Sequence, residues 1–353
     1  MVHLSWNKLS EKQKQYIRSV TDKSFILGMA YVNVLKLKEI ILKEVKKNRL
    51  VIIGDLVENY VSGLEDGEQF RKMDFAQVNN ILESINSKYQ NLLIHLTYSQ
   101  NDVKFVLREF KPTRMIGFYG SWAGILHYNS VYWECIKNDI EVITHSPFIV
   151  EDEVKKYVKA VNIQNYKRLN NKWKSVNTDN LTIEGDNLFS IDQIIDFCND
   201  VKNLSWDWTG KTGACLTYKS EKRKVKNEKQ IDGVWNLNYV KNEFSKEGEL
   251  KIIAFGQNKI SPWEGYTLYH GARREKEFSE LGKNAELMES VHAEVHAIIN
   301  ALKLGYDLSK AILWVTKCPC SVCARIIKEA GIRCVIYLDE YSNSDVYQVL
   351  NDR

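Results

Sequence analysis

The stretch SVHAEVHAIINAL, Ser290–Leu302, places a histidine and a glutamate two residues apart at the head of an otherwise apolar run. The run is typical of a core helix, which we expect to extend from His292 to about Gly305. An imidazole and a carboxylate are unusual at the start of such a helix. Their explanation lies further along the chain.

Two cysteines follow at the junction of a predicted strand, AILWVTK, and a predicted helix, SVCARIIKEA. Cys320 and Cys323 lie three residues apart in the first helical turn, so both sulfurs share one face, and the positive helix end favours the thiolates that bind zinc. Pro319 is typical of a helix start. With His292 as third ligand, tetrahedral zinc keeps an open position for water, which is typical of catalytic sites.

Glu294 stands two residues from the histidine, close enough to exchange protons with a water on the metal without binding the metal itself. H-A-E together with P-C-S-V-C matches the zinc nucleobase deaminase signature. The chain resembles the cytidine deaminase-like superfamily, and HAEVHAI with CPCSVCARIIKEAGIRCVIY is most similar to deoxycytidylate deaminases. The resemblance covers about Leu188 to the end, and implies an α/β/α sandwich, bound Zn²⁺ and deamination of a cytosine nucleotide, dCMP to dUMP.

Further residues follow from the resemblance. Asn258, in FGQN, is similar to the family's G-x-N asparagine, which contacts the substrate; the alternative is a plain turn. The backbone of Ala293 and the loop around Trp263 would frame the base, although Trp263 also suits a core position. Arg273 and Arg274 suit a nucleotide phosphate, and a solvated basic turn explains them equally well.

Several features depart from the family pattern. His296 replaces an asparagine found in many relatives, and we interpret it as a satisfied interior histidine. Cys318 is interpreted as a bystander. About 30 residues between the first two strands of this half look inserted, with KSEKRKVKNEKQ as a solvated excursion. The chain ends soon after SDVYQVL, which leaves no room for the fifth strand usual in the family.

The N-terminal half alternates short apolar runs with helical stretches. The runs are RLVIIGD, NLLIHLTYS, RMIGFYGS and EVITHSPF. Strands spaced by crossover helices predict a parallel sheet covered on both faces. The fold class is therefore α/β: a separate Rossmann-like α/β domain at 1–163, a polar linker at 164–187, and the zinc-dependent deaminase domain at 188–353.

The role of the first domain stays open. GFYGSWAG, Gly117–Gly124, is a strand-to-helix turn that suits phosphate, but strand-to-helix packing around glycine explains it equally well. Asp55 follows a predicted strand, where ligands of open sheets bind. This half is expected to bind a regulatory nucleotide or nucleic acid, or to drive assembly of the protein. We expect a homo-oligomer.

Composition narrows the class of protein. The 353 residues carry a mild net charge of +4, so any nucleic-acid surface must be local. Seven cysteines, three of them clustered, argue against a disulfide framework. Neither a signal peptide nor a membrane-spanning run is expected, so we predict a cytoplasmic protein. Besides dCMP deamination, editing of a base within RNA or single-stranded DNA and a catalytically silent nucleotide sensor or scaffold remain open.

Overall fold

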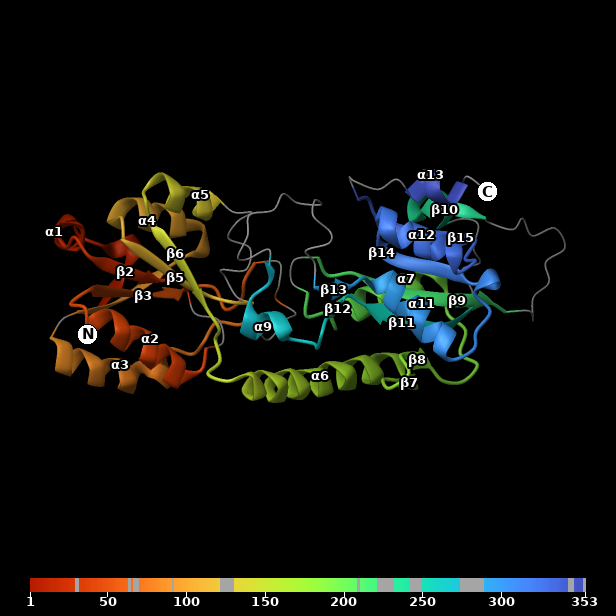
Figure 1. The fold of residues 1–353 in the computed structure, drawn as a ribbon, viewed down its shortest axis with the longest axis horizontal. Helices are drawn as coiled ribbons and strands as arrows, with labels where there is room; N and C mark the ends of the chain where they lie inside the picture. Colours follow the sequence, from red (N-terminus) through yellow and green to blue (C-terminus); the bar gives the residue numbers. More distant parts are fainter. Residues whose placement is uncertain are drawn as a thin grey trace. The chain divides into compact units, whose positions relative to one another are not determined.

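The computed structural model describes residues 1–28, 32–62, 65, 70–90, 92–120, 130–207, 210–220, 232–241, 249–273, 289–341 and 346–351. They form two compact units. The first unit comprises Met1–Tyr157 and Gly265–Glu289, and the second comprises Val158–Glu264 and Ser290–Arg353. Both units are mixed α/β (Figure 1). Within the described ranges, no helix combines the length and the hydropathy that a membrane crossing requires.

The first unit is built on a six-stranded sheet in the order β1-β4-β3-β2-β5-β6, with every neighbouring pair parallel. Its strands are β1 (Val2–Ser5), β2 (Lys23–Ile26), β3 (Leu50–Leu56), β4 (Leu93–Tyr98), β5 (Arg114–Phe118) and β6 (Glu141–His145). The four predicted apolar runs correspond to β3, β4, β5 and β6. The sequence analysis did not identify β1 and β2, because each is only four residues long.

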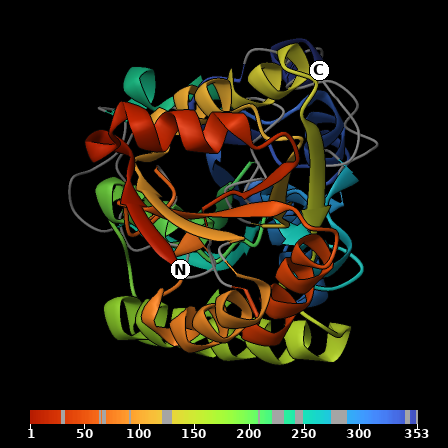
Figure 2. The same ribbon diagram turned by 90° about the vertical axis from the view of Figure 1, so that its left-hand side faces the viewer.

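Helices cover both faces of this sheet (Figures 1 and 2). One layer contains α1 (Glu11–Ser19), α4 (Val103–Phe110) and α5 (Ser130–Lys137), and the other contains α2 (Val34–Val45) and α3 (Ala76–Tyr89). The apolar faces of α2 and α3 pack against β2, β3 and β5 in one buried cluster. The unit also contains α9 (Tyr266–His270).

The second unit is built on a five-stranded sheet in the order β10-β15-β14-β9-β11. The strands β9 (Gly213–Lys219) and β11 (Leu250–Gln257) are antiparallel, whereas β14 (Ile312–Lys317), β15 (Cys334–Asp339) and β10 (Gly233–Asn236) are parallel. On one face lies α7 (Ile191–Lys202), which begins at the N-cap Ser190 with a capping box. On the other lie α11 (Ala293–Lys303) and α12 (Ser321–Glu329).

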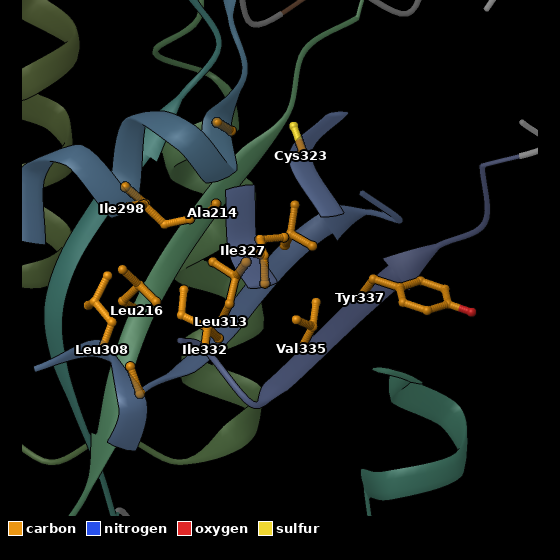
Figure 3. Packing of buried hydrophobic residues seen from close by; sticks show 14 of the residues in the cluster. Ala214, Leu216, Ile298, Leu308, Leu313, Cys323, Ile327, Ile332, Val335 and Tyr337 are labelled. Atoms are coloured by element: carbon orange, nitrogen blue, oxygen red, sulfur yellow. The ribbon is translucent and has the colours of Figure 1, made fainter. Parts of the chain in front are cut away.

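The core beneath α11 and α12 joins the helices to the sheet. Figure 3 shows Ile298 of α11 and Ile327 of α12 packed over Leu313 of β14. Cys323 belongs to the same buried cluster, so the apolar core fixes the position of one predicted zinc ligand. A glycine allows the helix to approach the sheet closely: a Cβ at Gly256 would lie 2.5 Å from the backbone nitrogen of Ala297.

The expectation that this half lacks a fifth strand is wrong. The strand β10 comes from the segment between β9 and β11 and pairs in parallel with β15, from Gly233 opposite Cys334 to Asn236 opposite Tyr337. The inserted segment therefore supplies an edge strand of this sheet. Residues 221–231, most of the charged excursion, lie outside the described residues. The chain closes with α13 (Val346–Asn351).

The segment 164–187, predicted as a linker, contains secondary structure. The helix α6 (Glu151–Trp173) runs into it, and β7 (Val176–Asn177) and β8 (Thr182–Ile183) form a short antiparallel pair. Of the GFYGSWAG turn, Gly117 and Phe118 end β5, and residues 121–124 lie outside the described residues.

Candidate metal centre

A two-stranded ribbon brings the first ligand into place. The strand β12 (Lys259–Ile260) pairs antiparallel with β13 (Ser290–Val291), so Asn258, just before one strand, lies beside His292, just after the other. His292 is the N-cap of α11, with extended backbone. The helix therefore begins where the sequence analysis expected it.

The two sulfur ligands lie at the start of another helix. Cys320 is the N-cap of α12, and Cys323 lies in its first turn. The Nδ1 atom of His292 is 3.2 Å from the sulfur of Cys323 and 3.5 Å from the sulfur of Cys320. All three ligand atoms lie within 4.8 Å of one another, the only such group of His, Cys, Asp and Glu found in the described part of the chain. The three predicted ligands thus converge from two helix N-termini.

The electrostatics of this group favour a thiolate. A hydrogen bond from Cys323 lowers the pKa of Cys320 to about 4, against the effect of burial. The same hydrogen bond, together with burial, raises the pKa of Cys323, so the first proton lost from the pair leaves Cys320. The hydrogen bond to Cys320 raises the pKa of His292 to about 9. One nitrogen and two sulfurs, one of them readily ionised, form a donor set suited to zinc.

Glu294 lies beside this group without joining it. Its side chain is buried in the first turn of α11, and burial raises the pKa of the carboxyl. The Cys323 thiol lies within hydrogen-bonding reach of the carboxyl, yet the buried Oε2 atom has no hydrogen-bond partner among the described residues. A buried oxygen without a partner is costly, and it suits a group that completes its hydrogen bonds only when the site is filled.

Asn258 is buried and connects the ribbon to the start of α11. Its Oδ1 accepts a hydrogen bond from the backbone N–H of Ala293 at 3.1 Å. Its Nδ2 donates to the carbonyl of Gly210 at 2.6 Å and to Asp207 Oδ2 at 3.3 Å. Both predicted substrate-binding positions, Asn258 and Ala293, are therefore held against each other. Ser205, whose hydroxyl donates to the carbonyl of Asn258, completes the arrangement.

Asp207 is the residue that the sequence analysis missed. It is buried, and its carboxylate holds the amide of Asn258. It lies in SWDWTG, between α7 and β9, in a segment with no recognisable motif. Its position became evident only from the folded chain.

The other predicted substrate residues lie in different surroundings. Trp263 is half-buried in the loop after β12, in the second unit. Arg273 is exposed in the first unit, where its backbone N–H donates to Glu289. Arg274 lies outside the described residues.

The two interpreted bystanders are both buried. The Nδ1–H of His296 donates to the carbonyl of Gln257 at 3.0 Å, and burial lowers the pKa of the imidazole to about 4. A neutral, hydrogen-bonded imidazole fits the interior role expected for it. Cys318 is buried, and its backbone N–H donates to the backbone carbonyl of Asp339.

Comparisons with known proteins agree with this geometry. Residues 251–339 match the family model of the cytidine and deoxycytidylate deaminase zinc-binding region. A probable deoxycytidylate deaminase of Drosophila melanogaster is 32% identical over 111 residues, which cover 29% of this chain and 50% of that protein. Human deoxycytidylate deaminase is 42% identical over 55 residues, or 15% of this chain and 30% of that protein. The chain thus spans half or less of the length of these relatives.

Among solved structures, dCMP deaminase of the cyanophage S-TIM5 is similar, with 21% identity and a TM-score of 0.27 over 45% of this chain and 90% of that chain. The matched region 251–339 contains His292, Cys320 and Cys323. Residues 251–339 of this chain are therefore similar to the zinc-binding region of cytidine and deoxycytidylate deaminases, which supports a place in the cytidine deaminase-like superfamily.

Proposed function

We propose that the chain is a zinc-dependent hydrolytic deaminase of a cytosine nucleotide, converting dCMP and water to dUMP and ammonia. The observation that carries this proposal is the convergence of the His292, Cys320 and Cys323 ligand atoms within 4.8 Å, beside a buried carboxylate with an unpaired oxygen. The similarity of this region to deoxycytidylate deaminases supports dCMP as the substrate.

His292, Cys320 and Cys323 would hold the metal. Zinc bound there would lower the pKa of a bound water to about 7 and so supply a nucleophile at neutral pH. The start of α12 stabilises the thiolate that the ligand set requires, because the helix end is positive. Burial of Cys323 in the apolar core keeps this ligand fixed relative to the sheet.

Glu294 would move the protons. Its carboxylate takes a proton from the attacking water and delivers one to the departing amino group of the base, so that the carbon–nitrogen bond breaks with release of ammonia. The unpaired Oε2 atom supports this role, because its hydrogen-bonding capacity is not used by another protein group. Asn258 would contact the nucleotide while it holds the N–H of Ala293 in place.

The rest of the chain would carry a separate domain. We propose that residues 1–163 form a Rossmann-like domain and that residues 188–353 form the deaminase domain. The parallel strand order β4-β3-β2-β5-β6, with helices in both layers, supports the first assignment. Homo-oligomer formation and a cytoplasmic location belong to the same proposal.

The test is ammonia release from a substrate panel. Purified zinc-loaded chain is incubated with dCMP, dCTP, cytidine, single-stranded DNA and tRNA, beside the matched variant Glu294→Gln. We expect ammonia from dCMP with wild type and almost none with the variant. Release from a polymer alone would replace dCMP deamination with polynucleotide editing. A zinc-loaded chain inactive on the whole panel would contradict catalysis and favour a silent sensor.

A further inference from the structure

A second group of histidines lies in the first unit, where β1 meets β4. These strands pair in parallel with His3 directly opposite His95. The two Nδ1 atoms face each other at 2.9 Å. The side chain of His95 is only 10% exposed, whereas that of His3 is 52% exposed, so the pair is open to solvent from one side.

Each imidazole has a carboxylate at its other nitrogen. The Nε2 atom of His95 is 3.0 Å from Asp55 Oδ2, and the Nε2 atom of His3 is 3.8 Å from Glu83 Oε1. Asp55 is ionised: burial acts to raise the pKa of its carboxyl, but hydrogen bonds from His95 and Lys72 lower it below the usual range. A carboxylate only accepts, so the Nε2 atom of His95, at hydrogen-bonding distance from Asp55, carries its hydrogen. The contact of His3 with Glu83, at 3.8 Å, is too long for a hydrogen bond and does not place the hydrogen of His3.

The hydrogen on Nε2 leaves His95 with a lone pair at Nδ1. This atom lies 2.9 Å from Nδ1 of His3. Two groups can satisfy the lone pair: a hydrogen carried on Nδ1 of His3, or a metal ion that binds both nitrogens from one side. Metal-bound histidines show the same pattern, because the nitrogen that does not bind metal donates to a carboxylate.

A helix beside the pair carries a buried amide oxygen. Among the described residues, Asn79 Oδ1 of α3 has no hydrogen-bond partner. On the helix, Asn79 follows Phe75 by four residues and precedes Glu83 by four, so the three share one face. His3 contacts both of the outer residues: its ring is 6.1 Å from that of Phe75 and its Nε2 is 3.8 Å from Glu83. The central residue, Asn79, therefore lies on the helix face that His3 contacts.

We propose that His3 Nδ1, His95 Nδ1 and Asn79 Oδ1 form a second metal site, which takes a divalent transition metal ion of the zinc class. Two imidazole nitrogens and an amide oxygen suit zinc and its neighbours, and the remaining positions would be filled by water. The ion would join β1, β4 and α3, and so fasten the edge strand of the parallel sheet. Because none of these residues belongs to the deaminase region, this inference does not depend on the proposed function.

The competing explanation is a direct hydrogen bond between the two imidazoles. In that case His3 carries its hydrogen on Nδ1 and donates it to His95, and the pair binds no metal. Metal stoichiometry separates the two, because only the metal site adds a second bound ion to the one expected at Cys320 and Cys323.

The experiment measures bound zinc by elemental analysis on the untagged full-length chain, after equilibration with zinc and removal of loosely bound ions. We expect two equivalents in wild type and one in His3→Gln, whose side chain is exposed enough for the fold to tolerate the change. Asn79→Ala should also lose the second equivalent. Glu83→Gln, which removes the carboxylate beside His3 and its ion pair with the Met1 amino group, should weaken that site by roughly 10-fold.

Two controls complete the design. His270→Gln removes another histidine of the first unit that lies beside a carboxylate, Glu151, and should keep both equivalents. The double variant Cys320→Ser/Cys323→Ser tests the other site. When loaded with cobalt, it should lack the thiolate-to-cobalt charge-transfer absorption but still bind one equivalent of the metal. Bound zinc that is the same in wild type, His3→Gln and Asn79→Ala would overturn the proposal, whatever the occupancy of the site at Cys320 and Cys323.

Discussion

The two candidate metal-binding clusters, at His292 in the second unit and at His3 and His95 in the first, differ in where their carboxylates lie. In the second unit, Glu294 lies beside the ligand group, and its Oε2 atom is buried without a partner. In the first unit, Asp55 lies behind an imidazole and is also paired with Lys72 at 2.7 Å. A carboxylate whose oxygens are already engaged orients a neighbour, whereas one with an unpaired oxygen is available to bind or move a proton.

The clusters also differ in how they are built. The second unit places its ligands at two helix N-termini, where the positive helix end favours thiolates. The first unit places His3 and His95 on neighbouring strands, where the register of a parallel sheet sets their separation. We infer that the ligands at helix N-termini in the second unit serve chemistry. The histidine pair of the first unit fastens an edge strand. The following predictions test this contrast.

The largest effect is expected from Glu294→Gln. Removing the proton carrier should lower turnover by roughly 10²–10⁴-fold, the usual contribution of general acid–base catalysis. Zinc content should be unchanged, since Glu294 is not among the ligands. Ammonia release and elemental analysis on the same sample measure both, with the exposed Glu329→Gln at the end of α12 as control. Full activity in the Glu294 variant would remove the contrast between the clusters.

A large loss of stability is expected from Gly256→Ala. The added Cβ would lie 2.5 Å from the nitrogen of Ala297 and 2.8 Å from the carbonyl of Ala293, both backbone atoms of α11. Moving the helix should cost about 3 kcal/mol of unfolding free energy and displace His292 from the sulfurs. Urea unfolding and zinc content measure this. Gly210→Ala, where a Cβ meets nothing within 4 Å, is the control, and equal stability of the two variants would contradict the argument.

A smaller effect on the same centre is expected from Asn258→Ala. The buried N–H of Ala293 would lose its acceptor, at a cost of about 1–3 kcal/mol. Because this N–H begins α11, we expect a loss in kcat of about tenfold even at saturating dCMP, and a milder loss in Asp207→Asn. A change in KM alone would mean that Asn258 only contacts substrate and does not position the helix.

The smallest effect concerns Glu134 of α5, a carboxylate whose hydrogen bonds are already made. The bidentate hydrogen bond with Arg108 holds the pKa of Glu134 at about 2, against 4.5 in an unfolded chain. A lowered pKa contributes stability that is present above pH 4.5 and is lost as the pH falls through about 2. Glu134→Gln should therefore lower the urea midpoint modestly at pH 7, and the difference should narrow below pH 4.5. A difference that is independent of pH would contradict the ion-pair interpretation.

The sequence was informative where structure is local. The starts of α11 and α12 were predicted from the residues that mark helix ends. Cys320 and Cys323 share a helix turn because a helix repeats every 3.6 residues, whatever the rest of the chain does. These features needed no knowledge of the fold.

The sequence was less informative where distant segments meet. The edge strand β10 was missed because a four-residue run, GVWN, carries no sign of which strand it will pair with. Asp207 was missed because its only signal is its contact with Asn258, 51 residues away. The helix α6 was mistaken in part for a linker, since its C-terminal half is rich in Asn and Lys and shows little apolar periodicity.

Residue types and short spacings by themselves determined that this chain carries an H-x-E and a C-x-x-C at helix starts, because helical periodicity and helix capping act within a few residues. Only the tertiary structure decided that His292 and Cys320, 28 residues apart, meet at 3.5 Å, and that Glu294 keeps an unpaired oxygen beside them. It likewise decided that His3 lies opposite His95. Such contacts depend on which apolar faces are buried against which sheet. That choice is set by the free energy of apolar burial summed over the whole core.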